Sequence, residues 1–488
     1  MNILAIDQGT TSSRAIVFNQ NFQMIGKSQS EFEQFFPQDG WVEHEPKAIW
    51  KTTLESCISA IAEANISAQD IAGVGITNQR ETTLIWDRKT GECIYRAIVW
   101  QDRRTQDFCE AHPEYLETIR AKTGLRLDPY FSGTKIMWIL DHVPGAREKA
   151  EKGELAFGTV DTFLLWQLTK GKVHATDATN ASRTLLFNIH TQKWDPELLK
   201  LFNIPRSLLP EVKNCADDYG MTDPKLFGFA IPIRAIAGDQ SAAMIGQDCL
   251  SPGLIKCTFG TGAFMMLNTG DQPILSKNRL LTTVGYRLNN QVTYALEGSV
   301  FIAGAGVKWL RDKLGLIQTS QETQALAESV ESSEGVYFVP ALTGLGAPYW
   351  RPEARGMIMG LSRNTGRAHI VRATLEAVAF QTYDLLDAMQ KDGAGIKQLR
   401  IDGGMVQNNW FCQCLSDLLG IDAVRPKIIE TTALGVAYLV AIAIGRFASW
   451  HDIDHQWEID LITHPVMDEK KRAEKLAGWK NAVEHLLF

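Results

Sequence analysis

The stretch that decides the fold is "ILAIDQGTTSSRAIVF", Ile3–Phe18. An apolar run ends at Asp7, small and polar residues follow, and the chain is apolar again over Ala15–Phe18. The pattern predicts two strands joined by a turn that is rich in Gly, Thr and Ser. It also raises a question of chemistry, because a buried strand here ends in a carboxylate.

The turn has the composition of a phosphate cradle. Gly9 lets backbone N–H groups come close to a phosphate, and Arg14 adds a planar cation suited to phosphate oxygens. Asp7, at the end of the first strand, could hold a hydrated Mg²⁺. The hydroxyl donors are those of Thr10, Thr11, Ser12 and Ser13. A Walker A loop is excluded because strand rather than helix follows, and a polar hairpin with an Asx turn is the alternative interpretation.

A second hairpin of the same kind opens the other half of the chain. "GLIKCTFGTGAFMMLN", Gly253–Asn268, predicts strand, Gly-Thr-Gly turn and strand, and "LRIDGG", Leu399–Gly404, predicts a strand that enters a double glycine. Two halves with like openings predict duplicated α/β domains, residues 1–249 and 250–488, with a ligand cleft between them. Three glycine turns at strand ends would then hold one nucleotide from both domains.

Length and composition agree with two globular domains. A chain of 488 residues is too long for one ordinary core. The net charge of -7 is mild and argues against a general nucleic-acid binder. No apolar stretch is long enough to span a bilayer, and the start of the chain has no basic region typical of a signal peptide. The eight scattered Cys indicate reduced thiols and a cytoplasmic protein.

Hydrophobic periodicity places further elements along the chain. A strand over Ile231–Ala237 runs into Gly238-Asp239-Gln240, where a small-residue helix is expected to begin at Ser241 and to end at Gly246. Other expected strands are Asn2–Ile6, Arg14–Phe18, Phe22–Ser28, Ile71–Ile76, Thr82–Trp86, Ala97–Trp100 and Thr293–Gly298. Expected helices are Pro46–Asn65, Thr134–Asp141, Asp161–Leu168, Phe301–Leu314 and His369–Gln390, with a further helix ending at Leu419.

Nine short motifs run from one end of the chain to the other: Asp7–Arg14, Thr77–Thr83, Val99–Arg104, Asp128–Lys135, Thr179–Thr184, Ala237–Gln240, Phe259–Phe264, Leu342–Trp350 and Asp402–Gly404. With these motifs the chain resembles the FGGY carbohydrate kinases, within the actin-like, ribonuclease-H-like ATPase superfamily. Two family-wide signatures also fit, Tyr130–His142 and Gly356–Glu376. The runs "NQRE", "DPYFSGTK" and "GLGAPYW" resemble the members that act on glycerol. The resemblance implies two ribonuclease-H-like domains and ATP-dependent phosphorylation of glycerol to sn-glycerol 3-phosphate, the first step of glycerol catabolism.

Phosphoryl transfer to an alcohol needs a base, a metal ion and donors for the spreading negative charge. By resemblance Asp239 is the base, and its alternative role is to cap the helix that follows, which is compatible with the first. Asp7 and Asp239 are implied at Mg²⁺, and Arg14 is implied in catalysis. The implied contacts to ATP are Thr10, Thr11, Ser12, Arg14, Thr261, Gly304, Lys308, Gly404 and Asn408. Lys308 stands where related members often carry Gln.

Glycerol is small and uncharged, so a protein must bind its hydroxyls. Arg80 can donate, Glu81 can accept and Tyr130 can do either. These match the family's substrate positions, as do Asp239 and Gln240, while Trp100 and Phe264 match apolar walls. The alternatives are a solvated Arg80–Glu81 pair at a hairpin tip and ordinary core packing for the two aromatic rings. Lys135 and Trp138 are expected to be structural, with the lysine in solvent.

The regulatory segments of the family are altered here. Members inhibited by fructose 1,6-bisphosphate carry Gly-Gly-Thr-Arg where this chain has Phe227-Gly228-Phe229-Ala230, and the phosphorylatable His of other members is missing from the same loop. We therefore expect neither control. The resemblance also implies a homo-oligomer, either dimer or tetramer. Two alternatives stay open at this point, a kinase for another polyol or ketose and an ATP-gated scaffold.

Overall fold

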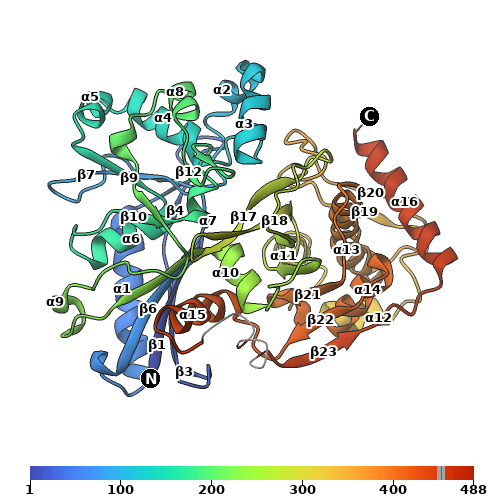
Figure 1. Ribbon diagram of the computed structural model, residues 1–488. Coiled ribbons are helices and arrows are strands. Elements are labelled where there is room, and N and C mark those ends of the chain that lie inside the picture. The colour runs from blue at the N-terminus through green and yellow to red at the C-terminus, as the bar shows by residue number, and fades with distance from the viewer. Residues whose placement is uncertain (448–451, 453–456, 488) are drawn as a thin grey trace.

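The computed structural model describes residues 1–447, 452 and 457–487 and shows two α/β halves side by side (Figure 1). The first half is built on a five-stranded sheet in the order β14-β6-β1-β2-β3. Its strands are β1 (Asn2–Gln8), β2 (Ser12–Phe18), β3 (Met24–Glu31), β6 (Ile71–Asn78) and β14 (Ile233–Gly238). β1 is antiparallel to β2 and parallel to β6, and this register places Asp7 opposite Arg14.

The second half repeats this arrangement. Its seven-stranded sheet has the order β17-β18-β16-β15-β21-β22-β23. The strands are β15 (Leu254–Phe259), β16 (Ala263–Gly270), β17 (Leu281–Leu288), β18 (Gln291–Val300), β21 (Gln398–Asp402), β22 (Ala423–Pro426) and β23 (Ile459–Thr463). β15 is antiparallel to β16 and parallel to β21, as β1 is to β2 and β6. The predicted duplication of α/β domains is therefore confirmed.

Helices from both halves cover the first sheet. α1 (Pro46–Glu63) packs on β2 and β3 with Pro46 in its first turn, as the sequence predicts. α15 (Thr431–Ala443) lies against β1, β6 and β14 and crosses α10 (Asp239–Gly246). The crossing needs glycine, because a Cβ on Gly435 would lie 1.8 Å from the Ala242 carbonyl oxygen. A late segment of the chain thus packs on the first sheet, and the boundary at residues 249 and 250 stays a prediction.

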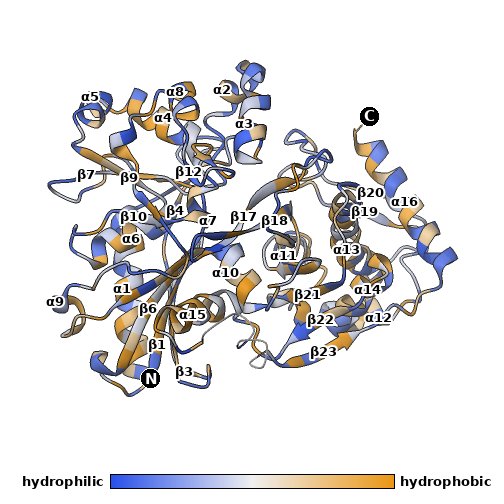
Figure 2. Ribbon diagram, in the orientation of Figure 1, coloured by the Kyte–Doolittle hydropathy of each residue, from blue (hydrophilic) through white to orange (hydrophobic). Residues whose placement is uncertain are grey.

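The remaining elements enclose the two sheets. Apolar residues line the inward faces of the strands and helices (Figure 2). Helices α11 (Gly304–Asp312), α13 (Arg367–Lys391) and α14 (Asn409–Leu419) pack around the core of the second sheet. The other helices are α2 (Gln106–Ala111), α3 (Leu116–Thr123), α4 (Ser132–His142), α5 (Ala146–Glu151), α6 (Val160–Leu168), α7 (Ala178–Ala181), α8 (Pro196–Leu201), α9 (Pro224–Phe227), α12 (Glu322–Glu328) and α16 (Glu469–Leu487).

Short strands and turns of 3₁₀ helix complete the inventory. The strands are β4 (Gln34–Phe35), β5 (Glu43–His44), β7 (Leu84–Asp87), β8 (Ala97–Ile98), β9 (Leu155–Gly158), β10 (Ala175–Asp177), β11 (Phe187–Asn188), β12 (Lys193–Trp194), β13 (Glu211–Lys213), β19 (Tyr337–Val339) and β20 (Met357–Met359). The 3₁₀ turns are η1 (Ala68–Asp70), η2 (Pro113–Tyr115), η3 (Arg206–Leu208) and η4 (Gly404–Gln407).

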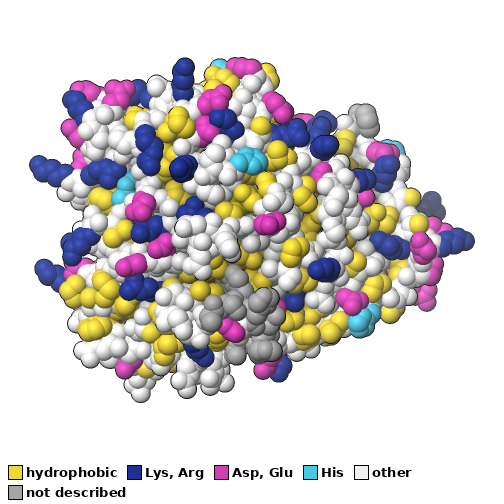
Figure 3. Space-filling view, in the orientation of Figure 1, with side chains coloured by type: hydrophobic (Ala, Val, Ile, Leu, Met, Phe, Trp, Pro, Cys, Tyr) yellow, Lys and Arg dark blue, Asp and Glu magenta, His cyan; other side chains and the backbone are white. Residues whose placement is uncertain are grey.

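The expected elements agree with these bounds except at some ends. β3 begins at Met24 rather than Phe22, because Phe22 has a φ of 55° and belongs to the preceding turn. β8 ends at Ile98, which leaves Trp100 outside the strand. Among the described residues no helix is long and apolar enough to cross a membrane. The face seen in Figure 3 carries acidic and basic side chains intermixed.

Candidate active site

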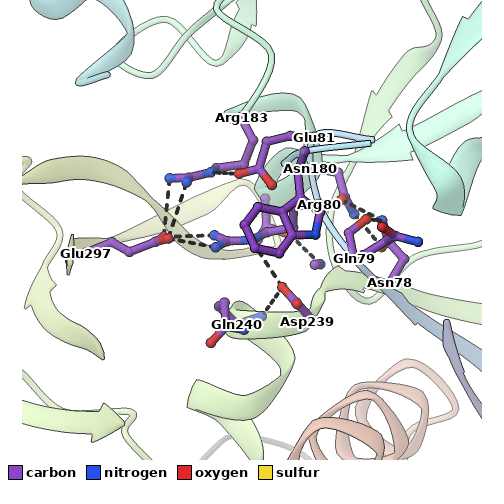
Figure 4. Close-up of polar contacts among 12 residues, drawn as sticks. Asn78, Gln79, Arg80, Glu81, Asn180, Arg183, Asp239, Gln240 and Glu297 are labelled. Atoms are coloured by element: carbon purple, nitrogen blue, oxygen red, sulfur yellow. Dashed lines mark hydrogen bonds and ion pairs between the residues drawn. The ribbon is translucent and has the colours of Figure 1, made fainter. Parts of the chain in front are cut away.

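Arg80 and Glu81 follow β6, and both are buried, with only 3% and 2% of their surface exposed. The alternative of a solvated pair at a hairpin tip is therefore wrong. The tertiary structure explains the burial, because Glu297 pairs with Arg80 and Arg183 pairs with Glu81, both from distant parts of the chain (Figure 4). Glu81 also has a φ of 62°, a left-handed conformation that a residue other than glycine rarely adopts and that is often found at functional sites.

Glu297, on β18 of the second sheet, binds one edge of the Arg80 guanidinium through two hydrogen bonds. Arg80 Nη1 donates to Glu297 Oε2 at 2.8 Å and Nη2 donates to Oε1 at 2.7 Å. Arg183 Nε donates to Glu81 Oε1 at 2.6 Å, and Arg183 Nη2 donates to Glu297 Oε1 at 3.2 Å. Burial alone would raise the pKa of Glu297, but Arg183 and Arg80 lower it to about 2. These four charges form a closed buried cluster that joins the two halves.

Asp239 is the first residue of α10, at the end of β14, and about a third of its side chain (30%) is exposed. Its Oδ1 lies 3.2 Å from Arg80 Nε. The predicted N-cap is wrong: Gly238 occupies that position, and Asp239 Oδ1 accepts only from the next backbone N–H, that of Gln240, at 2.7 Å. The carboxylate is therefore directed at Arg80 and partly exposed, rather than closing the helix end.

Three aromatic rings stand beside these polar groups. The ring centroid of Trp100 lies 5.7 Å from that of Tyr130 and 6.1 Å from that of Phe264. Trp100 and Phe264 are only partly buried, and Trp100 packs at the edge of an apolar core. Trp100 Nε1 also donates to Thr10 Oγ1 at 2.9 Å, which ties this aromatic wall to the first glycine hairpin.

Lys135 fixes the backbone around Tyr130. Its Nζ donates to the carbonyl oxygens of Tyr130 at 2.7 Å and Phe131 at 3.2 Å, and the whole side chain is buried. The expectation that Lys135 is solvated is wrong, because these carbonyls lie within its reach and replace water. Its expected structural role agrees with the contacts. Trp138 stacks on His142, with ring centroids 4.3 Å apart, on the same helix.

The two glycine hairpins are built alike. Gly9 N donates to Ser12 O at 2.9 Å, and Gly260 N donates to Gly262 O at 2.9 Å. Thr10 and Ser12 are partly exposed on the first hairpin, and Thr11 and Thr261 are exposed. Backbone N–H groups and hydroxyls at such turns suit phosphate oxygens.

The second hairpin packs closely on Gly304, one of the residues expected at the nucleotide. Gly304, at the start of α11, lies so close to Gly260 that a Cβ would be 2.6 Å from the Gly260 carbonyl oxygen. Gly403, which precedes the exposed Gly404, has a φ of 92° and packs on Phe259. Lys308 is exposed on α11.

Asn408 has a structural role in this arrangement. It caps α14, because its Oδ1 accepts from Phe411 N at 2.9 Å. Its Nδ2 donates to Thr323 Oγ1 at 3.3 Å. These contacts fix the start of α14, just after the third glycine turn.

Asp7 and Arg14 lie opposite each other at the mouth of the first hairpin, with Arg14 Nη1 4.0 Å from Asp7 Oδ2. Arg14 also pairs closely with Glu430, which precedes α15, and Lys27 Nζ lies 2.6 Å from the other Glu430 oxygen. Burial raises the pKa of Asp7 to about 6, although Arg14 opposes the shift. The nearby positive charges do not cancel the effect of burial on the pKa of Asp7. A bound cation would supply the missing positive charge.

Four charged residues escaped the sequence reasoning: Arg183, Lys256, Glu297 and Glu430. A signal was present for two of them. Lys256 and Glu297 interrupt apolar strand sequences, "GLIKCTF" and "YALEGSV", and a charge inside a buried strand requires a partner. Arg183 lies within a motif already singled out, but nothing in the sequence shows which carboxylates it meets.

Family models and known proteins match the whole of this architecture. The model for the N-terminal domain of the FGGY family of carbohydrate kinases matches residues 2–246, and that for the C-terminal domain matches residues 255–444. The chain belongs to the FGGY family of carbohydrate kinases. The residues described above are therefore those of an FGGY kinase with an actin-like ATPase fold.

Two curated glycerol kinases match this FGGY kinase over almost their full length. The glycerol kinase of Alcanivorax borkumensis is 58% identical over 99% of this chain and 97% of its own. Glycerol kinase 1 of Pseudomonas aeruginosa is 58% identical over 99% of this chain and 98% of its own.

A solved structure matches equally completely. The Plasmodium falciparum glycerol kinase with ADP is 38% identical, covers 100% of this chain and 98% of its own, and superimposes with a TM-score of 0.93. A gluconate kinase from Lactobacillus acidophilus, at 21% identity and a TM-score of 0.88, shows only that the fold is shared.

Proposed function

We propose that this FGGY kinase transfers the γ-phosphoryl group of ATP to a terminal hydroxyl of glycerol and gives sn-glycerol 3-phosphate, the first step of glycerol catabolism. The observation that carries the proposal is the exposed carboxylate of Asp239 beside the buried Arg80–Glu81 pair and the aromatic wall. The high identity to curated glycerol kinases supports the same substrate.

Asp239 is the proposed base. Its carboxylate would accept the proton of the attacking hydroxyl as the oxygen bonds to the γ-phosphorus. Arg80 keeps it at a fixed place, since the guanidinium is itself held by Glu297. As the new oxygen–phosphorus bond forms, the bond from the γ-phosphorus to ADP breaks and the proton goes to Asp239, so the carboxylate must be placed at the attacking hydroxyl.

The other substrate contacts follow from the hydroxyls of glycerol. Arg80 retains N–H donors beyond those used by Glu297, and Glu81, Tyr130 and Gln240 add an acceptor and further polar groups. Trp100 and Phe264 would cover the carbon edge. A site of buried, partnered polar groups rejects analogues that lack a hydroxyl, because its groups would then stay unpaired.

The proposed nucleotide site lies along the glycine turns. Thr10, Thr11, Ser12 and Thr261 would donate to phosphate oxygens, and Arg14 would stabilise the charge that spreads over the transferring group. Gly304, Lys308, Gly404 and Asn408 would line the nucleoside side.

Asp7 on β1 and Asp239 at the end of β14, both in the first sheet, would hold Mg²⁺ together with water and phosphate oxygens. When bound, this ion neutralises charge on the phosphates. The raised pKa of Asp7 fits a carboxylate that awaits a cation. Among the described residues no group of three or more metal-ligating side chains comes together, and Mg²⁺ sites built largely from water and phosphate do not require one.

Release of ADP with and without polyol tests the proposal. The panel contains glycerol, dihydroxyacetone, erythritol, xylulose and gluconate, each with Mg·ATP. We expect turnover to be strongest with glycerol and negligible without a polyol. If turnover is fastest with another compound of the panel, that compound is the preferred substrate. If no compound of the panel increases turnover, the proposed activity is contradicted.

Two properties of the protein remain further proposals. All eight cysteines are free thiols, which fits a reducing compartment, and we place the enzyme in the cytoplasm. We also propose a homo-oligomer, either dimer or tetramer, which sedimentation at the assay concentration would test.

A further inference from the structure

A buried lysine of the second half reaches into the substrate site. Lys256 lies on β15, and none of its surface is exposed. Its Nζ makes a close contact with Gln240 Oε1 and donates to Thr258 Oγ1 at 3.2 Å. Gln240 is the second residue of α10 and directly follows Asp239 (Figure 4). Lys256, which is neither the proposed base nor part of a glycine turn, therefore holds a residue of the proposed polyol site in place.

Two carboxylates act on the pKa of the buried Lys256. Burial lowers its pKa, but the negative charges of Asp402 and Asp239 oppose that shift. Asp402 is itself buried, where it accepts from Gln247 Nε2 at 2.7 Å and from Thr431. Lys256 Nζ donates to Gln240 Oε1 and to Thr258 Oγ1, so an oxygen acceptor faces it in both contacts.

The contact with Lys256 orients the carboxamide of Gln240. Its oxygen accepts from Lys256 Nζ, and the opposite orientation would set the NH₂ hydrogens against those of Nζ. Gln240 Nε2 then points away from Lys256, and within the part of the chain that the structure describes no acceptor is bonded to it. The remaining N–H donors of Gln240 are thus free for a ligand.

We propose that Lys256 is a positioning residue that locks Gln240 as a hydrogen-bond donor to a hydroxyl oxygen of the polyol. The inference rests on the proposed function. Asp239 and Gln240 then present one acceptor and one donor next to each other, which is the complement of an alcohol group. Lys256 acts only through Gln240, and it ties the orientation of that amide to the second sheet.

A double-mutant cycle tests this coupling. The proteins are the wild type, Lys256→Met, Gln240→Ala and the double variant, assayed for kcat and KM with glycerol and with 1,2-propanediol. Lys256→Met is expected to lower kcat/KM for glycerol by about 10- to 100-fold, mainly through KM, and to leave KM for ATP unchanged. It should also shrink the preference for glycerol over 1,2-propanediol, because the freed amide can turn.

The cycle separates positioning from a merely structural effect. In the Gln240→Ala background, Lys256→Met should lower kcat/KM by less than about threefold, since the residue through which it acts is already gone. Losses that multiply in the double variant would overturn the inference. Lys256→Gln is the conservative variant: its amide N–H can still donate to Gln240, so it should recover part of the glycerol affinity that Lys256→Met loses.

The outcomes distinguish this inference from the proposed function. If Lys256→Met does not fold, as shown by its thermal unfolding, Lys256→Gln carries the same cycle with Gln240→Ala. Wild-type turnover with glycerol and multiplying losses would contradict only the role of Lys256. Absence of glycerol-dependent turnover in the wild type would contradict both.

Discussion

Arg80 Nε lies 3.2 Å from Asp239 Oδ1, so a residue assigned to substrate binding touches the residue assigned as the base. The opposite edge of the same guanidinium is bound by Glu297 from the second sheet. The position of the base is therefore set by both halves of the protein. A change in the packing between the two halves would move Asp239 and the polyol contacts together. The packing of the halves would therefore affect the rate of phosphoryl transfer.

Replacing Glu297 by Gln should destabilise the protein strongly. The change leaves the buried guanidinium groups of Arg80 and Arg183 with Glu81 as their remaining buried carboxylate partner. Loss of one partner from a buried charge cluster costs about 3–5 kcal/mol. Chemical denaturation of the two proteins at pH 7 measures the difference in the free energy of unfolding.

The matched control is Glu55→Gln on α1, where Glu55 pairs with Lys51 at the surface at 3.9 Å. That exposed pair should contribute within about 0.5 kcal/mol of zero. If both variants lose equally little stability, the buried cluster does not hold the halves together as described.

Trp100→Phe should separate nucleotide binding from polyol binding. The smaller ring keeps the aromatic contact with Tyr130 but loses the indole N–H that donates to Thr10 Oγ1. We expect KM for ATP to rise a few-fold, because Thr10 loses a fixed partner, with KM for glycerol changed by less than about twofold. Steady-state kinetics with each substrate varied in turn give both values. The reverse pattern would place Trp100 at the polyol alone.

Asp384 should make the stability of the second half depend on pH. It accepts from Tyr349 Oη and Trp479 Nε1, each at 2.8 Å, and burial raises its pKa to about 7. A group whose pKa is raised by folding favours the folded state at low pH, and this contribution is lost as the pH rises through about 7. Asp384→Asn should therefore gain stability relative to the wild type between pH 4 and pH 8, on the order of 3 kcal/mol.

Thermal unfolding of the wild type and Asp384→Asn across that pH range measures the effect. Asp271→Asn, at an exposed position, is the control and should show a flat difference. A flat difference for Asp384→Asn as well would mean that its carboxyl group titrates alike in the folded and unfolded chains.

Fructose 1,6-bisphosphate should not regulate this enzyme. The segment that carries Gly-Gly-Thr-Arg in inhibited members is the end of α9 and the residues after it, where Phe229 is 41% exposed. The nearby Arg234 is paired with Asp218. We expect millimolar fructose 1,6-bisphosphate to change the rate by less than about twofold, because residues 227–230 contain no Arg for its phosphates. Strong inhibition in the glycerol assay would contradict this.

Contacts between residues close in the sequence could be predicted from it, and contacts between distant segments could not. Asp7 and Arg14 belong to one hairpin and Asp239 to one strand end, so their neighbourhood follows from nearby residues. Glu297 and Arg80 are brought together only by the packing of the two halves. The same is true of Lys256 with Gln240, and of α15 on the first sheet. A charge inside an apolar strand shows that a partner exists but does not name it.

The most direct test of the account is the glycerol-dependent release of ADP by Asp239→Asn, measured beside the wild type. The variant keeps the size of the side chain but cannot take the proton, so kcat should fall by at least about 10²- to 10⁴-fold. The affinity for ATP should fall much less than kcat, because the glycine hairpins and Arg14 still hold the phosphates and Asp7 remains for the metal ion. A folded Asp239→Asn variant with wild-type turnover would show that Asp239 is not the base.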